Sequence, residues 1–471
     1  MIRISTRSFW TLTAAMVLIG SAGLARGQGQ ETATDDTIEL VVGLLSDADK
    51  EMRAIGLEQV RSEAKGEAAT RKFAELLAKG LPSDAQVGLI NALTDRGDGA
   101  ARPAIVELLA SPDAAVKTAA ANSLGYLGQA EDVERLVALL RDGDDSLRGT
   151  ARASLIRMPH PGASAAIVTE LTGLPVDSSQ NTLWIALIEI LAARRATAAA
   201  ESLVPLAVDA DPAVRTAAMT ALGQLAGPAQ IPGMLAGILK AEKGPEREGA
   251  EKAVMFVCSR TEDPAQRAAP LLAAIEALPE AQQRQLWPTL GRVGGEAARQ
   301  AIEKLIADPK SHDIGLRAIC NWPDASIAPR LIELVEQEKH GDHRTSALRA
   351  LVRVAVLPDD RTDTQRLELL KQALGMCDRD AERTLVLQRA RAIRSVDSLR
   401  FLLPFVDQPA FMEQACLSIV ELAHHRALRD ANKTEFHAAL DKVMATSKDA
   451  TTVERARRYK NNQTWNRATG S

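Results

Sequence analysis

Aromatic side chains are scarce in this sequence, at 3% of the residues, although 46% of the residues are hydrophobic. A core must therefore be built from Ala, Leu, Val and Ile, of which Ala and Leu are strong helix formers. The chain also lacks sustained apolar–polar alternation and β-branched runs bounded by turns, which are the usual signals of strands. These absences predict an all-α protein.

Motifs of common reaction centres are lacking as well. The chain contains no GxxxxGK[ST] loop for phosphate and no GxSxG motif for a nucleophile. Its four cysteines form no CxxC pair, and its formal net charge of −4 does not favour a polyanion as partner. We therefore predict no catalytic residues, no cofactor, no metal ion and no nucleic acid.

The first 27 residues have the layout of a secretory signal peptide. Arg3 and Arg7 precede an apolar stretch from Phe9 to Leu24, and small residues follow. A membrane-spanning helix needs about 20 apolar residues, so this stretch is short for an anchor. We expect residues 1–27 to be removed and residues 28–36 to be a disordered linker. The mature protein would be periplasmic or secreted and not membrane-bound, and a retained anchor is the alternative.

One stretch occurs twice in nearly the same form. DPAVRTAAMTALGQL begins at Asp211 and DAAVKTAAANSLGYL begins at Asp113, with nine of fifteen paired residues identical. An Asp at the N-cap, a Pro at the first helical position and apolar residues at helical spacing predict a helix. Gly227-Pro228 would end that helix, and a second helix is predicted over residues 231–240.

This helix–turn–helix unit recurs about every thirty to forty residues, which gives about twelve units and a half-unit at each end. One helix pair cannot bury its apolar face, so neighbouring pairs must stack into a superhelical array. We predict an α-solenoid over residues 37–460 and a flexible tail over residues 461–471. The first helices should begin near Lys50, Asp84, Asp113, Asp145, Ser179, Asp211, Pro245, Glu280, His312, Asp342, Asp380 and Glu413.

The segments SPDAAVKTAAANSLGYLGQAEDVERLVALLRDG and DPAVRTAAMTALGQLAGPAQIPGMLAGILK resemble the HEAT-like repeats first described in phycobilisome lyases. The resemblance covers nearly the whole predicted solenoid. It implies a fold and not an activity, because such repeats serve enzymes, scaffolds and adaptors alike. Iron-dependent hydroxylases on similar repeats use His-Glu dipeptides, and none of the seven histidines here precedes a Glu.

An acid followed four residues later by a base recurs where first helices begin. The pairs are Asp49/Arg53, Asp113/Lys117, Asp144/Arg148, Asp211/Arg215 and Asp313/Arg317. We interpret them as N-caps with an ion pair in the favourable order along the helix. A charged ladder for a ligand is the alternative.

Two groups of histidines are candidate sites. The segment KHGDHR places His340, Asp342 and His343 in one polar turn, where two imidazoles and a carboxylate could hold Zn²⁺. Nothing nearby in the sequence completes the site, so a solvated turn is the favoured interpretation. The pair His424-His425 is predicted to lie at a helix end, where a cationic imidazole suits the helix dipole.

The cysteines and tryptophans are interpreted as packing residues. Aligning Arg215 with Arg317 places Cys320 opposite Ala218, and aligning Leu222 with Val420 places Cys416 there too. We therefore expect Ala218, Cys320 and Cys416 to occupy one small buried position. Cys258 and Cys377 are also predicted to be structural. Trp184 and Trp287 should pack inside, unless they are exposed as contact anchors.

The sequence predicts an exported, non-catalytic scaffold or adaptor that binds another protein along a solenoid surface. The alternative is an accessory subunit or atypical enzyme in polysaccharide or pigment chemistry that depends on a separate partner chain. The sequence identifies no binding residues. The basic segment RARRYKNNQTWNR should form the closing half-unit, with an acidic or phosphate partner as the alternative.

The leader generates the first testable prediction. Mature protein isolated from the cell envelope or medium should begin within Ala22–Gly27 or directly after it, as determined by N-terminal sequencing or intact mass. Protein that still begins at Met1 would show that the leader is retained.

Overall fold

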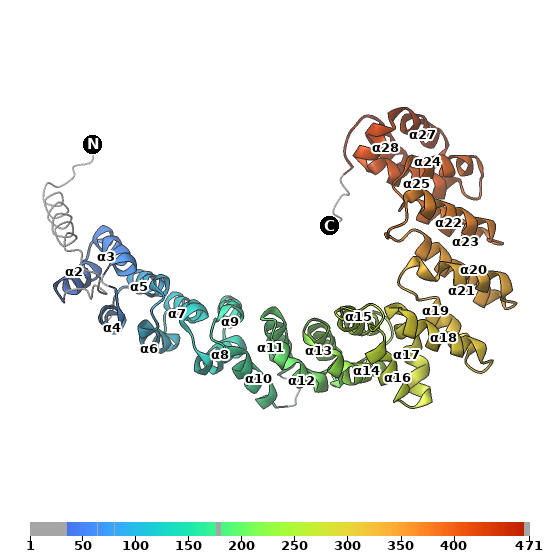
Figure 1. Cartoon of the computed structure of the whole chain (residues 1–471). Helices are drawn as coiled ribbons and strands as arrows, with labels where there is room; N and C mark the ends of the chain where they lie inside the picture. Colours follow the sequence, from blue (N-terminus) through green and yellow to red (C-terminus); the bar gives the residue numbers. More distant parts are fainter. Residues whose placement is uncertain (1–34, 64, 80, 176–179, 466–471) are drawn as a thin grey trace, which may run out of the picture. The chain divides into compact units, whose positions relative to one another are not determined.

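The computed structural model describes residues 35–63, 65–79, 81–175 and 180–465. These residues form 27 α-helices, α2 to α28, joined by turns and short 3-10 segments, and no strand occurs among them. The predicted all-α class is confirmed (Figure 1). The predicted leader lies outside the described residues, as does most of the predicted linker.

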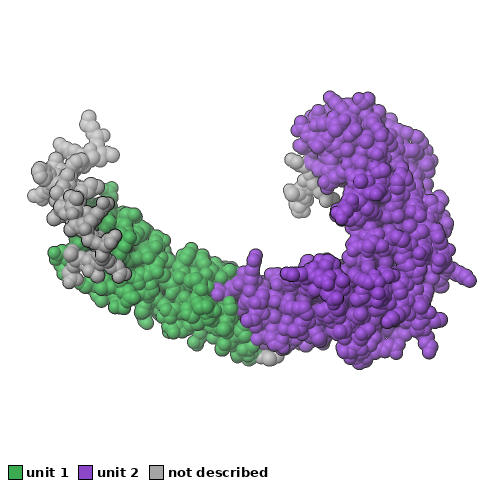
Figure 2. All heavy atoms as spheres, in the orientation of Figure 1, with its two compact units in different colours: residues 1–176 green, residues 177–471 purple. Residues whose placement is uncertain are grey.

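The chain divides into two compact units, residues 1–176 and residues 177–471 (Figure 2). The helices of unit 1 are α2 Asp35–Leu45, α3 Lys50–Ser62, α4 Glu67–Glu75, α5 Ser83–Arg96, α6 Arg102–Glu107, α7 Ala114–Leu127, α8 Val133–Asp142, α9 Asp145–Arg157 and α10 Ala163–Gly173.

Unit 2 continues the same alternation of first and second helices. Its helices are α11 Asn181–Ala193, α12 Ala200–Leu203, α13 Pro212–Leu225, α14 Ile231–Lys240, α15 Pro245–Ser259, α16 Ala269–Glu276, α17 Glu280–Val293, α18 Glu296–Ala307, α19 His312–Ile319, α20 Ala328–Gln337, α21 Gly341–Ala355, α22 Asp363–Gly375, α23 Asp380–Ala390, α24 Val396–Leu402, α25 Met412–His424, α26 Arg426–Ala431, α27 Lys433–Thr446 and α28 Ala450–Lys460.

First helices lie next to first helices in both units. In unit 1, α3, α5, α7 and α9 pack on one another in that order, and in unit 2 the odd-numbered helices from α11 to α25 do the same. Second helices form a parallel layer, for example α8 with α10 and α14 with α16. Each unit is therefore a two-layer stack of helix pairs, as the predicted solenoid requires.

The predicted helix starts agree closely with the structure. Eleven of the twelve predicted first helices begin within two residues of the expected position, and the start predicted at Ser179 lies outside the described residues. Helix α14 spans Ile231–Lys240 as predicted. Helix α2 begins at Asp35, two residues before the predicted array, and α28 ends at Lys460, where the predicted array ends.

Some second helices are not continuous α-helix. The segments Val204–Val208 and Leu403–Asp407 are 3-10 turns that follow α12 and α24, and each has a proline as its second residue. Proline removes a backbone donor and clashes with the preceding turn, so the α-helical pattern ends there. The repeating unit predicts a single second helix at each of these positions, and the structure differs there because of the prolines.

Four of the five predicted N-caps are confirmed, whereas Asp313 lies in the first turn of α19 and Ser311 holds the N-cap position. Side chains of Asp49, Asp113, Asp144 and Asp211 each accept a hydrogen bond from a backbone N–H of the first turn. The predicted ion pair along the helix forms between Asp313 and Arg317. Arg53, Arg148 and Arg215 each donate to a backbone oxygen that precedes the helix.

Arg215 shows where such an arginine goes instead. It donates to the backbone oxygens of Asp209 and Ala210, both at 3.0 Å. Its Nε also lies 2.7 Å from Oε1 of Glu246, which begins the next first helix. At Arg215, the base of the acid–base pair therefore joins consecutive repeats and does not brace its own helix.

Glycine allows the first helices to come into close contact. A methyl group added at Gly223 of α13 would lie 3.0 Å from Cα of Ala253 in α15. At Gly291 of α17 it would lie only 1.9 Å from the backbone oxygen of Ala318 in α19. Backbone atoms cannot rotate away as a flexible side chain can, so these positions fix how closely the helices approach.

A pair of glycine substitutions tests this contact. Gly291→Ala should destabilise the protein by about 1–3 kcal/mol, because the neighbouring backbone must shift. Gly249→Ala in α15 is the control, since nothing lies within 4 Å of the added methyl group. It should be neutral or stabilise the helix by roughly 0.5–1 kcal/mol. Urea unfolding followed by circular dichroism measures both, and equal effects of the same sign would contradict the close contact.

Arginines of one repeat also bond the end of the preceding first helix. Arg260 donates to the backbone oxygens of Gly223, Gln224 and Ala226 at the end of α13. Arg353 of α21 donates to those of Cys320 and Trp322, at 3.1 and 2.6 Å. The last carbonyls of a helix have no partner within the helix, so these arginines complete the hydrogen bonding across the repeat boundary.

Replacing Arg353 should therefore cost more than replacing an exposed arginine. Arg353→Met removes charged hydrogen bonds to carbonyls and should destabilise the protein by about 2 kcal/mol. Arg299→Met, which removes an exposed pair with Glu296 one turn away, should change stability by less than about 0.5 kcal/mol. The same unfolding experiment compares them, and a similar small loss for both would rule out the proposed role of Arg353.

Candidate functional site

An exposed row of side chains follows the C-terminal halves of the first helices. Each member lies three residues after a small buried residue such as Ser123 or Ala253. The exposed row consists of Asp95, Tyr126 and Arg157 in unit 1, and of Gln224 and Phe256 in unit 2. At this position of the repeat the side chain is acidic, aromatic, basic or neutral, whereas the buried residues beside it are small or aliphatic.

Two large aromatic side chains occupy this row. Tyr126 is 50% exposed and Phe256 is 60% exposed. The guanidinium of Arg157, the next member of the row, lies 4.1 Å from the centre of the Tyr126 ring. Trp184 and Trp287, by contrast, are buried, which confirms their predicted packing role. The aromatic side chains available for contact are therefore different from the tryptophans considered in the sequence.

The predicted equivalence of Cys320 with Ala218 is wrong. It depended on aligning Arg215 with Arg317, but Arg215 is buried whereas the Arg317 side chain is 69% exposed. Cys320 directly follows the last residue of the short helix α19 and is partly exposed, while Ala218 and Cys416 are fully buried within their helices. A shared charge at a helix start is therefore a poor guide to the register.

The predicted packing role of the thiols is confirmed by their environment. Cys258, Cys377 and Cys416 are buried, and burial raises the pKa of each thiol to about 11. Burial also raises the pKa of Cys320 to about 12, even though Arg353 lies nearby. The thiolate is the nucleophilic form, so these four side chains are poorly suited to covalent chemistry.

The histidine turn of the sequence becomes part of a larger cluster. Of the three residues predicted there, only His343 joins it, from the first turn of α21. Its partners are His312, the first residue of α19, and Glu338, which directly follows α20. The candidate ligand atoms of these three side chains all lie within 4.8 Å of one another. We call this set the histidine cluster.

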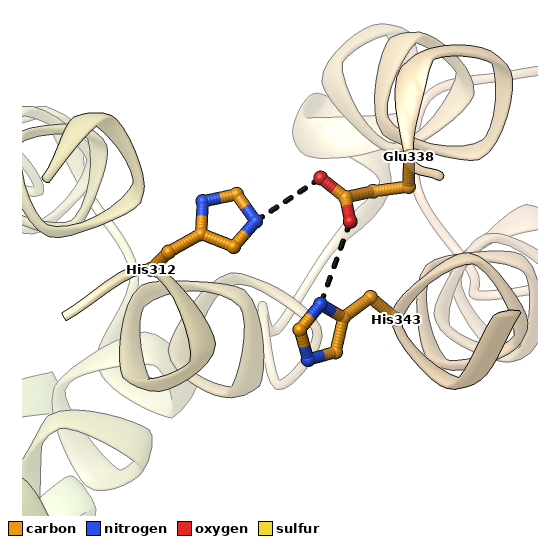
Figure 3. Close-up of side chains that lie close together, drawn as sticks. All are labelled: His312, Glu338 and His343. Atoms are coloured by element: carbon orange, nitrogen blue, oxygen red, sulfur yellow. Dashed lines mark hydrogen bonds and ion pairs between the residues drawn. The ribbon is translucent and has the colours of Figure 1, made fainter. Parts of the chain in front are cut away.

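Both imidazoles of the cluster face one carboxylate (Figure 3). Nε2 of His312 lies 3.0 Å from Oε1 of Glu338, and Nδ1 of His343 lies 3.4 Å from Oε2. The three side chains are partly buried, with exposed fractions of 30%, 15% and 24% for His312, Glu338 and His343. The cluster is thus held by its surroundings and still open to solvent.

Oxygen atoms behind the cluster orient the two rings. Nδ1 of His312 lies 2.6 Å from the backbone oxygen of Ile306, and Nε2 of His343 lies 3.0 Å from Oδ1 of Asp313. Although burial opposes ionisation of Asp313, hydrogen bonds from Arg317 and His343 keep its pKa below the usual value. Asp313 is therefore an ionised acceptor for the ring of His343.

The other two residues of the predicted turn lie outside the cluster. His340 is exposed, and its ring lies 4.7 Å from that of His343. Asp342 is exposed in the first turn of α21, where a negative charge suits the helix dipole. The solvated-turn interpretation holds for these two side chains. His312 and Glu338 were missed, because they lie 31 and 5 residues before His343 and only the fold brings them together.

The second predicted pair has a structural environment. His424 ends α25, as predicted, and its Nδ1 lies 3.0 Å from the hydroxyl of Tyr459. Burial, Arg394 and His424 lower the pKa of His425, so the cationic form predicted for that ring is disfavoured. Tyr459 itself is buried in α28, and Arg455 pairs with Glu421. The basic C-terminal segment therefore packs as the closing half-unit up to Lys460.

A depression lies near the start of the described part of unit 1. Its lining includes Lys50, Arg53, Pro82 and Asp84. Both cations approach the Asp84 carboxylate, at 3.6 and 3.5 Å. The charged groups of this hollow satisfy one another, so they offer no vacant position for a charged ligand. No helix in the described residues has the length and hydropathy needed to cross a membrane.

Several solved structures are similar in fold. The karyopherin Kap121p bound to the extreme C-terminus of the protein phosphatase Cdc14p has a TM-score of 0.46 at 12% identity, covering 95% of this chain and 57% of that one. Kap121p bound to Nup53p has a TM-score of 0.45 at 12% identity, with coverages of 88% and 54%. This chain thus spans little more than half of the karyopherin chains.

A model of the full-length AP-3 complex has a TM-score of 0.40 at 14% identity, with coverages of 97% and 99%. No curated protein has a significantly similar sequence. The family model for HEAT repeats matches residues 70–156 and 171–255. These two segments match the HEAT-repeat model, and the helix pairs on either side of them continue the same alternation of first and second helices.

Proposed function

We propose that this protein is an exported, non-catalytic scaffold or adaptor that binds another protein along its solenoid surface. The observation that carries the proposal is the exposed row, in which an aromatic side chain lies next to polar or charged ones on neighbouring first helices of each unit. Aromatic and arginine side chains are the residues that most often dominate the binding energy of protein interfaces.

The stiffness of the stack supports this role. Neighbouring first helices touch at glycines and are joined by arginine bonds to carbonyls. A surface on such helices needs little ordering when a partner binds, so less binding free energy is lost. Phe256 and Tyr126 each have two side-chain torsions and a large apolar area, which suits them as contact anchors.

The alternative is an accessory subunit or atypical enzyme in polysaccharide or pigment chemistry that works with a separate partner chain. The four thiols do not favour it, since their raised pKa values disfavour the thiolate. The two hypotheses differ in what the mature protein should retain. A scaffold retains one dominant protein, whereas the alternative predicts a glycan or a pigment.

Affinity capture with matched variants tests the proposal. The mature protein is immobilised and incubated with the native envelope fraction, and retained molecules are identified by mass spectrometry. Phe256→Ala should reduce recovery of the dominant protein partner by about tenfold or more, the effect of losing one interface anchor. Because Phe256 is mostly exposed, its loss should leave the unfolding transition nearly unchanged.

Val208→Ala is the control for this experiment. Val208 is 42% exposed but lies in the 3-10 turn of a second helix, away from the exposed row. It should retain the partner. Equal losses for both variants, or no loss for Phe256→Ala, would contradict the exposed row as the binding surface. Recovery of a glycan or pigment without a protein would favour the alternative.

A further inference from the structure

We propose that the histidine cluster binds one divalent metal ion of the zinc class through His312, Glu338 and His343. The proposal does not depend on the scaffold function, because it concerns only the described side chains and an ion. The three ligands come from two consecutive helix pairs, α19–α20 and the start of α21–α22. A bound ion would therefore connect neighbouring repeats.

The hydrogen bonds made by the far nitrogen of each ring are the first argument. A metal-binding histidine usually donates its other ring N–H to a carboxylate or a backbone oxygen, which fixes the tautomer and the ring orientation. Both histidines of the cluster have such an acceptor, the Ile306 backbone oxygen for His312 and the Asp313 carboxylate for His343. This arrangement turns Nε2 of His312 and Nδ1 of His343 towards Glu338 (Figure 3).

The orientation of the carboxylate is the second argument. If each ring keeps one proton, on the nitrogen bonded to its oxygen acceptor, the other nitrogen carries a lone pair. Two lone pairs then face the negatively charged Glu338, and these groups repel. The arrangement becomes favourable only if each ring carries two protons or if the three groups share a cation. The ring centres lie 5.7 Å apart. A metal ion satisfies all three groups at once.

The distances between the ligand atoms show how far the side chains must move to bind an ion. Tetrahedral ligands at about 2.0–2.1 Å from zinc are roughly 3.3 Å from one another. The nitrogen–oxygen distances of 3.0 and 3.4 Å already match, whereas the whole set extends to 4.8 Å. Small rotations of partly exposed side chains can draw the two rings together, so the backbone need not move.

The ligand types select the class of ion. Imidazole nitrogen and carboxylate oxygen suit zinc and related transition metals, whereas Mg²⁺ and Ca²⁺ prefer oxygen ligands alone. Two histidines and one glutamate occupy three positions of a tetrahedron, and solvent can reach the fourth. The site would therefore bind an ion together with a water molecule or a fourth group from outside the cluster.

Metal titration of the full mature chain tests the proposal. Tag-free protein is freed of metal with a chelator and titrated with ZnCl₂ by calorimetry. We expect one saturable site per chain. At a hundredfold excess over Kd, zinc should raise the Tm by roughly 5 °C. Co²⁺ should give visible absorption bands of a four-coordinate site, which reports ligands independently of stability.

Variants identify the ligands. His312→Ala and His343→Ala should each lose the saturable site and the Co²⁺ bands, while circular dichroism verifies that the chain is folded. Asp313→Asn, which removes the negative charge behind His343, should weaken binding by about 10- to 100-fold. His340→Ala and His437→Ala are matched controls, an adjacent exposed histidine and a distant one in α27. Both should bind zinc as the parent chain does.

Two results would overturn the proposal. One is wild-type protein that shows no saturable binding of a single zinc ion and no rise in Tm. The other is a loss of binding in His340→Ala or His437→Ala as large as that in His312→Ala, which would mean that the histidines bind metal nonspecifically. Neither result bears on partner capture, so the scaffold proposal and the metal proposal fail separately.

Discussion

The close contact between neighbouring first helices is the constraint on which the rest of the structure depends. At Gly223 and Gly291 the backbones approach so closely that a single methyl group would contact the next helix. Core material consisting of Ala, Leu and Val, with few aromatics, is what such spacing requires. The scarcity of aromatic residues and the repeated Leu-Gly pair thus have one cause, the distance between helices.

The same closeness explains the arginines at the repeat boundaries. A helix end leaves carbonyl groups without partners, and an adjacent helix in contact can supply donors. Arg260 and Arg353 are long enough to reach the end of the preceding first helix. Arg260 bonds carbonyls of α13, and Arg353 bonds those of Cys320 and Trp322 just beyond α19. Burial lowers the pKa of Arg353, an unfavourable effect that its bonds offset. Polar groups therefore fix the order of repeats whose apolar faces are nearly interchangeable.

Helix boundaries could be predicted from the sequence because caps, prolines and helical spacing act within a few residues. Asp211 and Gly227-Pro228 mark their helix without any knowledge of its neighbours. The alignment of one repeat with another and the histidine cluster could not be predicted in this way, because both depend on contacts between repeats of unequal length. Arg215 and Arg317 look equivalent in sequence, yet one bonds the next repeat and the other faces solvent. His312 and Glu338 gave no signal, since each is unremarkable within its own helix pair.

The histidine cluster lies at a weak place in this packing. Helix α19 has 8 residues, fewer than any other first helix in the described chain, so it offers α21 a short apolar surface. Polar contacts replace it: Arg353 bonds the carbonyls beyond α19, and His343 bonds Asp313 at its start. Polar links across a boundary are weaker than a continuous apolar contact unless they are numerous or charged. An ion shared by His312, Glu338 and His343 would add a strong link where the helices themselves provide the least, and would keep the array stiff between its two better-packed sides.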